Sequence, residues 1–233
     1  MYPEICRIGP FTVYSYGLML VIAFILATLL ASREAKRHNI PPDLIFNACF
    51  GSFVSGIIGA RLLFILQNLG FYLKNPLEMI MLQHGGLSWY GGLAFGLIFG
   101  LVFLKVNKAD ILKTLDVVAP HLALAQAIGR IGCLLNGCCA GTVIHNKIPV
   151  QVVGSLLLLL MFFMLRLKLR GRHLSGQVIF TYLFFYSLKR FIIEFYRTDN
   201  PSVFLHFTLF HIISAGLFVF SLATLIILKS RKT

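Results

Sequence analysis

Charged residues are scarce in this sequence of 233 residues. They make up 12% of the chain, against 58% hydrophobic residues, and only eight are acidic. Soluble domains carry roughly one quarter charged residues. The deficit excludes an ordinary soluble protein and indicates a membrane protein.

Polar stretches are too short for any further domain, and low-complexity linkers or clear repeats are missing. We therefore expect one polytopic membrane domain over residues 1–233. The first apolar run lacks the basic start and the small-residue cleavage site of a signal peptide, so we expect it to persist as a helix. Apolar runs of about 18 residues or more predict spanning helices. Seven are present, at about 11–31, 44–67, 86–105, 112–134, 150–168, 175–196 and 204–228.

The net charge of +13 raises the question of a nucleic-acid partner. No soluble basic face exists to bind one, so we expect none. Most of the 21 basic residues fall in alternate loops, and short basic loops favour the cytoplasmic side. We therefore expect an all-α fold of about seven transmembrane helices, with the N-terminus outside and the C-terminus cytoplasmic. The loop residues are Arg33, Lys36, Arg37, Lys105, Lys108, Lys113, Arg166, Lys168, Arg170, Arg172, Lys229, Arg231 and Lys232.

Two helices carry small residues at every fourth position. They are Gly51, Ser55 and Gly59 in one run and Gly92, Gly96 and Gly100 in the next. Such stripes allow close helix packing in membranes, which is the interpretation we favour. The intervening segment 73–93 is too short to span twice. It is either a loop that dips toward a central cavity or an interfacial segment with Trp89 and Tyr90 at the membrane surface.

Charged residues inside the predicted spans indicate function, because they are costly in lipid. Arg61 lies within the second run and Arg130 near the end of the fourth. Near the end of the sixth, Tyr186, Arg190, Glu194 and Arg197 share one helical face by their spacing, so Glu194 can pair with either arginine. Lys189 lies beside them.

The arginines outnumber the carboxylate in this set, which leaves positive charge for a ligand. Arginine binds phosphate oxygens bidentately and stays charged when desolvated. The set therefore predicts a phospholipid. Its role could be a structural lipid site, a transport path, or catalysis at the ester beside the phosphate.

Five motifs resemble the prolipoprotein diacylglyceryl transferase family, in order and over most of the chain. They are IGPFTVYSYGLML (8–20), GIIGARLLFIL (56–66), GGLSWYGGLAFG (85–96), GRIGCLLNG (129–137) and RFIIEFYRTD (190–199). The resemblance implies a transferase of the bacterial inner membrane with seven helices around a central, lipid-accessible cavity. It would transfer the diacylglyceryl group of phosphatidylglycerol to the lipobox cysteine thiol of preprolipoproteins, in lipoprotein biosynthesis. No cofactor or metal is implied.

The resemblance also assigns residues. Arg130 and Arg190 match the family's essential arginines, and Glu194 and Tyr90 join them as candidate catalytic residues. Many members have histidine where Tyr90 stands, and a tyrosine is better suited to orient a group or donate a hydrogen bond. The candidate substrate-binding residues are Tyr16, Arg61, Asn136, Gly141, Tyr186 and Arg197.

The sequence also departs from the family pattern. Cys133 replaces the usual first asparagine of the signature and Cys138 the acid after it, and segment 141–155 is short. We interpret the cysteines as small fillers; the alternative is a reactive thiolate at Cys138 or Cys139 beside Arg130. The departures leave two other functions open: the same phospholipid chemistry on another acceptor, or a non-catalytic lipid-binding protein.

Overall fold

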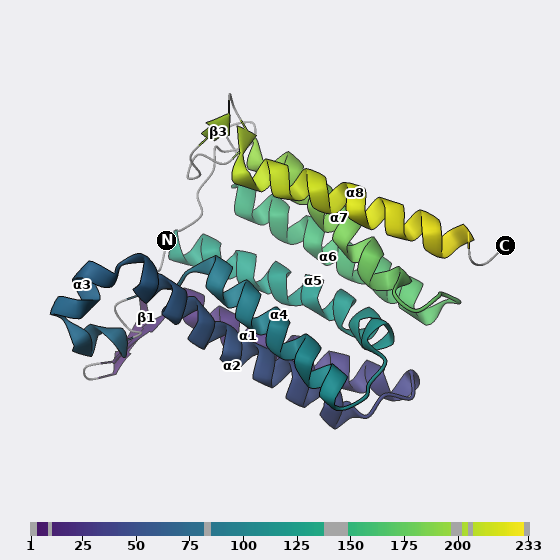
Figure 1. Ribbon diagram of the computed structural model, residues 1–233, viewed down its shortest axis with the longest axis horizontal. Helices are drawn as coiled ribbons and strands as arrows, with labels where there is room; N and C mark the ends of the chain where they lie inside the picture. The colour runs from purple at the N-terminus through teal and green to yellow at the C-terminus, as the bar shows by residue number, and fades with distance from the viewer. Residues whose placement is uncertain are drawn as a thin grey trace. The chain divides into compact units, whose positions relative to one another are not determined.

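The structure is a computed structural model that describes residues 4–8, 11–81, 85–137, 149–196, 202–204 and 207–230, and it is predominantly helical (Figure 1). The elements in chain order are β1 Glu4–Ile8, β2 Phe11–Tyr14, α1 Ser15–Arg37, α2 Pro42–Gln67, α3 Leu69–Lys74, η1 Pro76–Met79, α4 Trp89–Val106, α5 Ile111–Asn136, α6 Val150–Arg170, α7 Gln177–Glu194, β3 Ser202–Phe204, β4 Phe207–Thr208 and α8 Leu209–Ser230.

A helix corresponds to each of the seven predicted runs, but six of these helices, and not seven, qualify as membrane spans within the described residues. Within the described residues, α1, α2, α4, α5, α6 and α8 are long and apolar enough to span a membrane. The helix α7 has 18 residues and carries three charges, Lys189, Arg190 and Glu194, in its last turns. The chain is thus a multi-pass membrane protein.

Two predicted helix starts were wrong. Residues Phe11–Tyr14 form strand β2, paired antiparallel with β1, and the helix begins only at Ser15. Residues 202–208 contain the β3–β4 pair, and α8 begins at Leu209. Both stretches are apolar and rich in aromatic or β-branched residues, which hydropathy alone cannot separate from a helix.

The chain divides into two compact units, residues 1–31 with 115–233 and residues 32–114. In the second unit, α2 packs closely on α4. A Cβ added to Gly56 would lie 3.2 Å from the Gly92 carbonyl oxygen, and one added to Gly96 would lie 3.0 Å from that of Ser52. The small-residue stripes therefore serve helix packing, as predicted.

Gly91→Ala should lower the melting temperature of the protein in detergent. The new Cβ would overlap the Gly59 carbonyl oxygen and the Leu63 side chain, and such overpacking costs about 1–3 kcal/mol. Gly70→Ala is the matched control, because its Cβ meets nothing within 4 Å. Equal melting temperatures for the two variants would contradict the close α2–α4 contact.

In the first unit, α5 caps the start of α7. The Asp116 carboxylate accepts hydrogen bonds from the backbone N–H groups of Gly176, Val178 and Ile179 at 2.7, 2.9 and 2.8 Å. These N–H groups have no partner within their own helix. The contact fixes the first turn of α7 against the first turns of α5.

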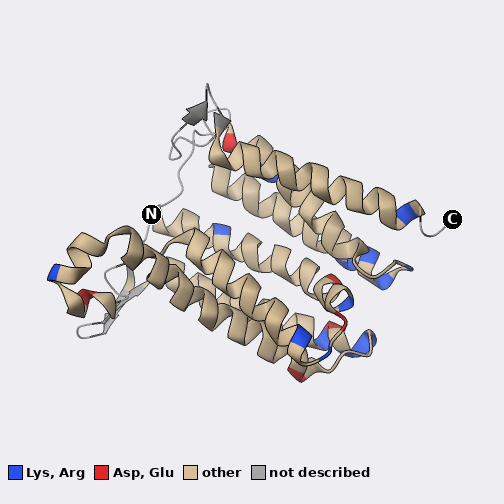
Figure 2. Cartoon of the chain, viewed as in Figure 1, with Lys and Arg blue, Asp and Glu red and all other residues tan. Residues whose placement is uncertain are grey.

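The cap gives a common reference point for the positions of Arg130 and Arg190 along their helices. Arg130 lies 14 residues after Asp116 on α5, and Arg190 lies 12 residues after Val178 on α7. At about 1.5 Å per residue, they are about 21 and 18 Å from the cap. Lys168, Arg170 and Lys229 mark the basic ends of α6 and α8, on the same side as the cap (Figure 2). Arg130 and Arg190 therefore lie at similar distances along their helices from the cap, and both are away from those basic ends.

Candidate active site

Charged side chains on the last turns of α7 form a buried ion pair. Arg190 Nη2 lies 3.1 Å from Glu194 Oε2, and the side chains are 11% and 0% exposed. The predicted Arg190–Glu194 pair is confirmed. Arg197, the other predicted partner of Glu194, lies outside the described residues.

The start of α8 completes the surroundings of this pair. The Arg190 guanidinium carbon lies 4.4 Å from the centre of the Phe210 ring, within the range of a cation–π contact. The Thr208 hydroxyl donates to Glu194 Oε1 at 2.8 Å. Arg190 is thus held in place by its own helix and by the helix that follows.

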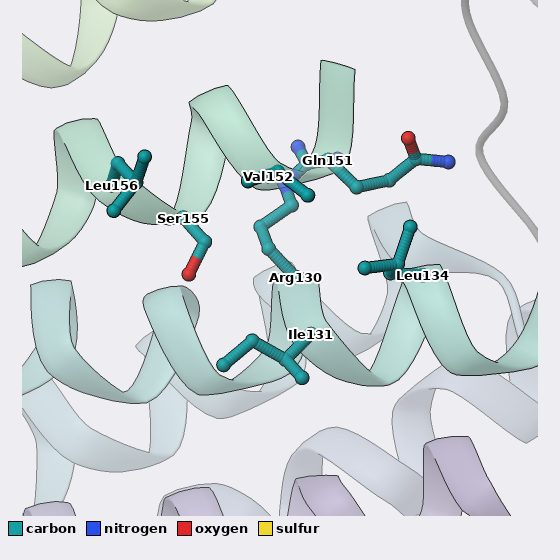
Figure 3. A pocket seen from close by; sticks show the side chains of 7 residues that line it. All are labelled: Arg130, Ile131, Leu134, Gln151, Val152, Ser155 and Leu156. Carbon is teal, nitrogen blue, oxygen red and sulfur yellow. The ribbon is translucent and has the colours of Figure 1, made fainter. Parts of the chain in front are cut away.

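Arg130 projects from α5 into an apolar slot between α5 and α6 (Figure 3). The slot has a volume of about 180 Å³, and among the described residues of its lining Arg130 is the only charged one. The residues that the structure describes make no hydrogen bond, ion pair or ring contact with the Arg130 guanidinium. The slot is lined by Arg130, Ile131, Leu134, Gln151, Val152, Ser155 and Leu156.

A third basic side chain, that of Lys189, lies close to both arginines. Lys189 is 7% exposed, and its Nζ stands 4.8 Å from the centre of the Tyr186 ring. Arg130 and Arg190 are both close enough to repel its charge. We call Arg130, Lys189 and Arg190 the cation cluster. Among the described residues, one carboxylate, that of Glu194, accompanies these three basic side chains, so the cluster is suited to an anion.

Other predicted site residues of the first unit lie around α5 and α7. A Cβ on Gly132 would be 3.5 Å from Tyr16 Cδ2. Tyr16 of α1 therefore lies beside α5, the helix that carries the motif GRIGCLLNG. Asn136 is the last residue of α5 and is partly exposed. Tyr186 stacks on Tyr182 with ring centres 5.6 Å apart. Gly141 lies outside the described residues, as do Cys138 and Cys139, whereas Cys133 is buried.

Arg61 lies in the second unit and holds the segment before α4. Its Nε and two Nη atoms donate to five backbone carbonyls, and its guanidinium carbon stands 5.4 Å from the centre of the Tyr72 ring. These contacts use all five guanidinium donors and leave none for a phosphate. The carbonyls are those of Glu78, Met79, Met81, Gly85 and Gly86.

Tyr90 follows this segment, in the first turn of α4. Its ring is edge-on to Trp89 at 5.4 Å, and the residue is 40% exposed. Just before it, the Ser88 N–H donates to the Ala60 carbonyl on α2 at 3.0 Å. Described residues of the segment 73–93 are therefore held by polar groups of α2. They are Glu78, Met79, Met81, Gly85, Gly86 and Ser88.

Sequence reasoning missed Thr208, Phe210 and His211. The available signal was a threonine followed three residues later by a polar residue at the start of an apolar run, which is typical of a helix N-terminus. His211 is also 2% exposed, and a histidine in an apolar helix invites a search for its partner.

Comparison with known proteins agrees with these observations. The family model described as prolipoprotein diacylglyceryl transferase matches residues 3–227. The phosphatidylglycerol–prolipoprotein diacylglyceryl transferase of Clostridium tetani is 32% identical over 247 residues, which cover 95% of this chain and 98% of the relative. That of Staphylococcus carnosus is 32% identical over 219 residues, 85% of this chain and 80% of the relative. With the motifs in order and the match nearly complete, the chain belongs to the prolipoprotein diacylglyceryl transferase family.

Proposed function

We propose that this protein transfers the diacylglyceryl group of phosphatidylglycerol to the lipobox cysteine of preprolipoproteins. Its relatives are named for phosphatidylglycerol and prolipoprotein. The observation that carries the proposal is the cation cluster at the edge of an apolar slot. This combination fits a phosphate attached to acyl chains.

The chemical step is a substitution at carbon. The cysteine sulfur attacks the glycerol carbon that carries the phosphate, a C–S bond forms, and the C–O bond to the phosphate breaks. The electron pair of that bond leaves with glycerol phosphate, whose phosphate gains one negative charge until it takes up the thiol proton. Groups that stabilise this charge where it develops lower the barrier.

The cation cluster divides this work between its arginines. Arg130 binds the phosphate of the incoming lipid, because the described residues leave its guanidinium available. Arg190 is fixed by Glu194 and Phe210, so it is preorganised for the leaving phosphate and needs little rearrangement. Tyr16, Asn136 and Tyr186 line the approach to Arg130, and Arg197 and Gly141 remain candidate substrate ligands.

Residues of the second unit serve the acceptor side. Tyr90 orients the reacting groups by a hydrogen bond, and Arg61 acts by positioning the segment that leads to Tyr90. The contacts of Arg61 with five carbonyls support this role over direct phosphate binding.

We place the site in the outer half of the bacterial inner membrane, with the N-terminus outside and the C-terminus cytoplasmic. Basic residues at the ends of α6 and α8 support this orientation. The cluster lies about 20 Å from that side, by the helical rise, in a hydrocarbon core about 30 Å thick. We keep one transferase domain over residues 1–233, with a cavity open to lipid, as part of this proposal.

The test is a transfer assay with purified protein, phosphatidylglycerol labelled in its acyl chains, and a lipobox peptide. We expect labelled peptide and an equal amount of glycerol phosphate. A peptide with serine in place of the lipobox cysteine is the control. Glycerol phosphate without labelled peptide would indicate another acceptor, and neither product would indicate a non-catalytic lipid-binding protein.

A further inference from the structure

The first turn of α8 is joined to the active-site ion pair by a chain of hydrogen bonds. Thr208 immediately precedes α8, and its hydroxyl donates to Glu194 Oε1 at 2.8 Å. The Thr208 backbone N–H donates to His211 Nδ1 at 3.1 Å. Glu194 pairs with Arg190 on its other oxygen. The order of contacts is thus His211, Thr208, Glu194, Arg190.

His211 acts here as the second half of a helix capping box. In that motif, the third residue of a helix accepts a hydrogen bond from the backbone N–H of the N-cap residue, while the N-cap hydroxyl satisfies a donor of the first turn. His211 is the third residue of α8, and it makes the first of these bonds. The Thr208 hydroxyl is instead directed to Glu194.

The proton positions follow from these contacts. Nδ1 of His211 accepts the Thr208 N–H, so Nδ1 acts as an acceptor and carries no proton in this contact. The Thr208 hydroxyl lies 3.2 Å from the same Nδ1 but only 2.8 Å from Glu194. It has a single proton, and a bond to a carboxylate is the stronger one. Thr208 therefore donates to Glu194.

The surroundings hold this arrangement rigidly. Thr208, His211 and Glu194 are 7%, 2% and 2% exposed. The His211 ring packs against Phe191 and Phe195, with ring centres 5.1 and 4.5 Å apart. The carboxylate also lies at the N-terminus of α8, where the helix dipole favours negative charge.

We infer that Thr208 and His211 are positioning residues for Arg190, acting through Glu194. Their capping contacts fix the Glu194 carboxylate, and the carboxylate fixes the guanidinium that stabilises the leaving phosphate. The inference rests on the proposed transferase function. It makes the junction of β4 and α8, outside the family motifs found in the sequence, part of the catalytic apparatus.

Thr208→Val removes the hydroxyl and keeps the side-chain shape. We expect kcat for transfer to fall about tenfold or more, which is the effect of losing one hydrogen bond to a charged group. The KM for phosphatidylglycerol should change less than about twofold, because Arg130 still binds the lipid. Thr208→Ser, which keeps the hydroxyl, should retain most of the activity. Thr224→Val is the control, since its hydroxyl on α8 bonds only Phe220 of the described residues.

His211 provides a second matched pair. Gln is a usual capping-box residue at this position, so His211→Gln should keep activity, whereas His211→Leu should lower kcat as Thr208→Val does. In a Glu194→Gln background, Thr208→Val should cost little more, because both changes act on one contact. Wild-type kcat in Thr208→Val, or equal losses in the Val and Ser variants, would overturn the inference. A wild-type protein without transfer activity would instead refute the proposed function.

Discussion

Replacing Arg130 by glutamine should lower kcat/KM for diacylglyceryl transfer by about a thousandfold, the upper range for losing one group that stabilises the developing charge, and leave the melting temperature unchanged. The reason is that the described residues make no hydrogen bond or ion pair with Arg130. We therefore expect its charge to serve the ligand and not the fold. Arg130→Lys keeps the charge but loses the bidentate fork, so it should be intermediate in activity.

Arg190→Gln should behave differently in one respect. Activity should fall to a similar extent, but the protein should also unfold at a lower temperature, because Glu194 would remain as a buried carboxylate without its ion-pair partner. Breaking a buried pair costs about 3–5 kcal/mol. The double variant Arg190→Gln/Glu194→Gln should recover much of the stability and none of the activity.

Transfer assays and thermal unfolding in detergent, run on the same preparations, separate these outcomes. Arg172→Gln is the control for both, since Arg172 is exposed beyond the end of α6. An Arg130→Gln protein with near-normal kcat/KM would remove Arg130 from the proposed phosphate site. A fall in its melting temperature as large as that of Arg190→Gln would give it a structural role instead.

Hydropathy predicted the helical part of the fold to within a few residues. The run at 44–67 became α2, Pro42–Gln67, and the run at 150–168 became α6, Val150–Arg170. The helix prediction was wrong for residues 11–14, because a strand of apolar β-branched and aromatic residues has the same hydropathy as the start of a helix. What separates them is the pairing of β2 with the preceding strand β1, which the hydropathy of residues 11–14 does not encode.

Part of the candidate site was also accessible to sequence reasoning. The i, i+4 spacing of Arg190 and Glu194 predicted their ion pair, because a helix fixes that geometry locally. The contact of Thr208 with Glu194 joins two elements across the β3–β4 pair, and no local periodicity encodes it. The same holds for Arg61, whose position in an apolar run marked it as functional but could not reveal its five carbonyl partners.

Arg61→Lys should release the segment 78–86 from α2. A lysine offers three donors on one nitrogen, whereas the guanidinium presents five donors in a plane. The Arg61 guanidinium contacts carbonyls near both ends of the segment: its Nε donates to the Met79 carbonyl at 3.1 Å and its Nη1 to the Gly86 carbonyl at 3.0 Å. A single ammonium cannot reach all of them, and the carbonyls it leaves would lose part-buried hydrogen bonds, each of which contributes about 1 kcal/mol.

Glutamyl endopeptidase provides a direct readout of this release, because Glu78 lies within the segment and is one of only four glutamates in the chain. Cleavage after Glu78 yields fragments 1–78 and 79–233. We expect the rate of this cleavage to rise at least about tenfold in Arg61→Lys, which corresponds to about 1.4 kcal/mol in the opening equilibrium, with Arg172→Lys unchanged. Transfer activity should fall in parallel, since Tyr90 follows the segment. Faster cleavage with full activity would show that the segment has no part in catalysis. Unchanged cleavage would mean that the remaining contacts, such as that of Ser88 with Ala60, hold the segment without Arg61.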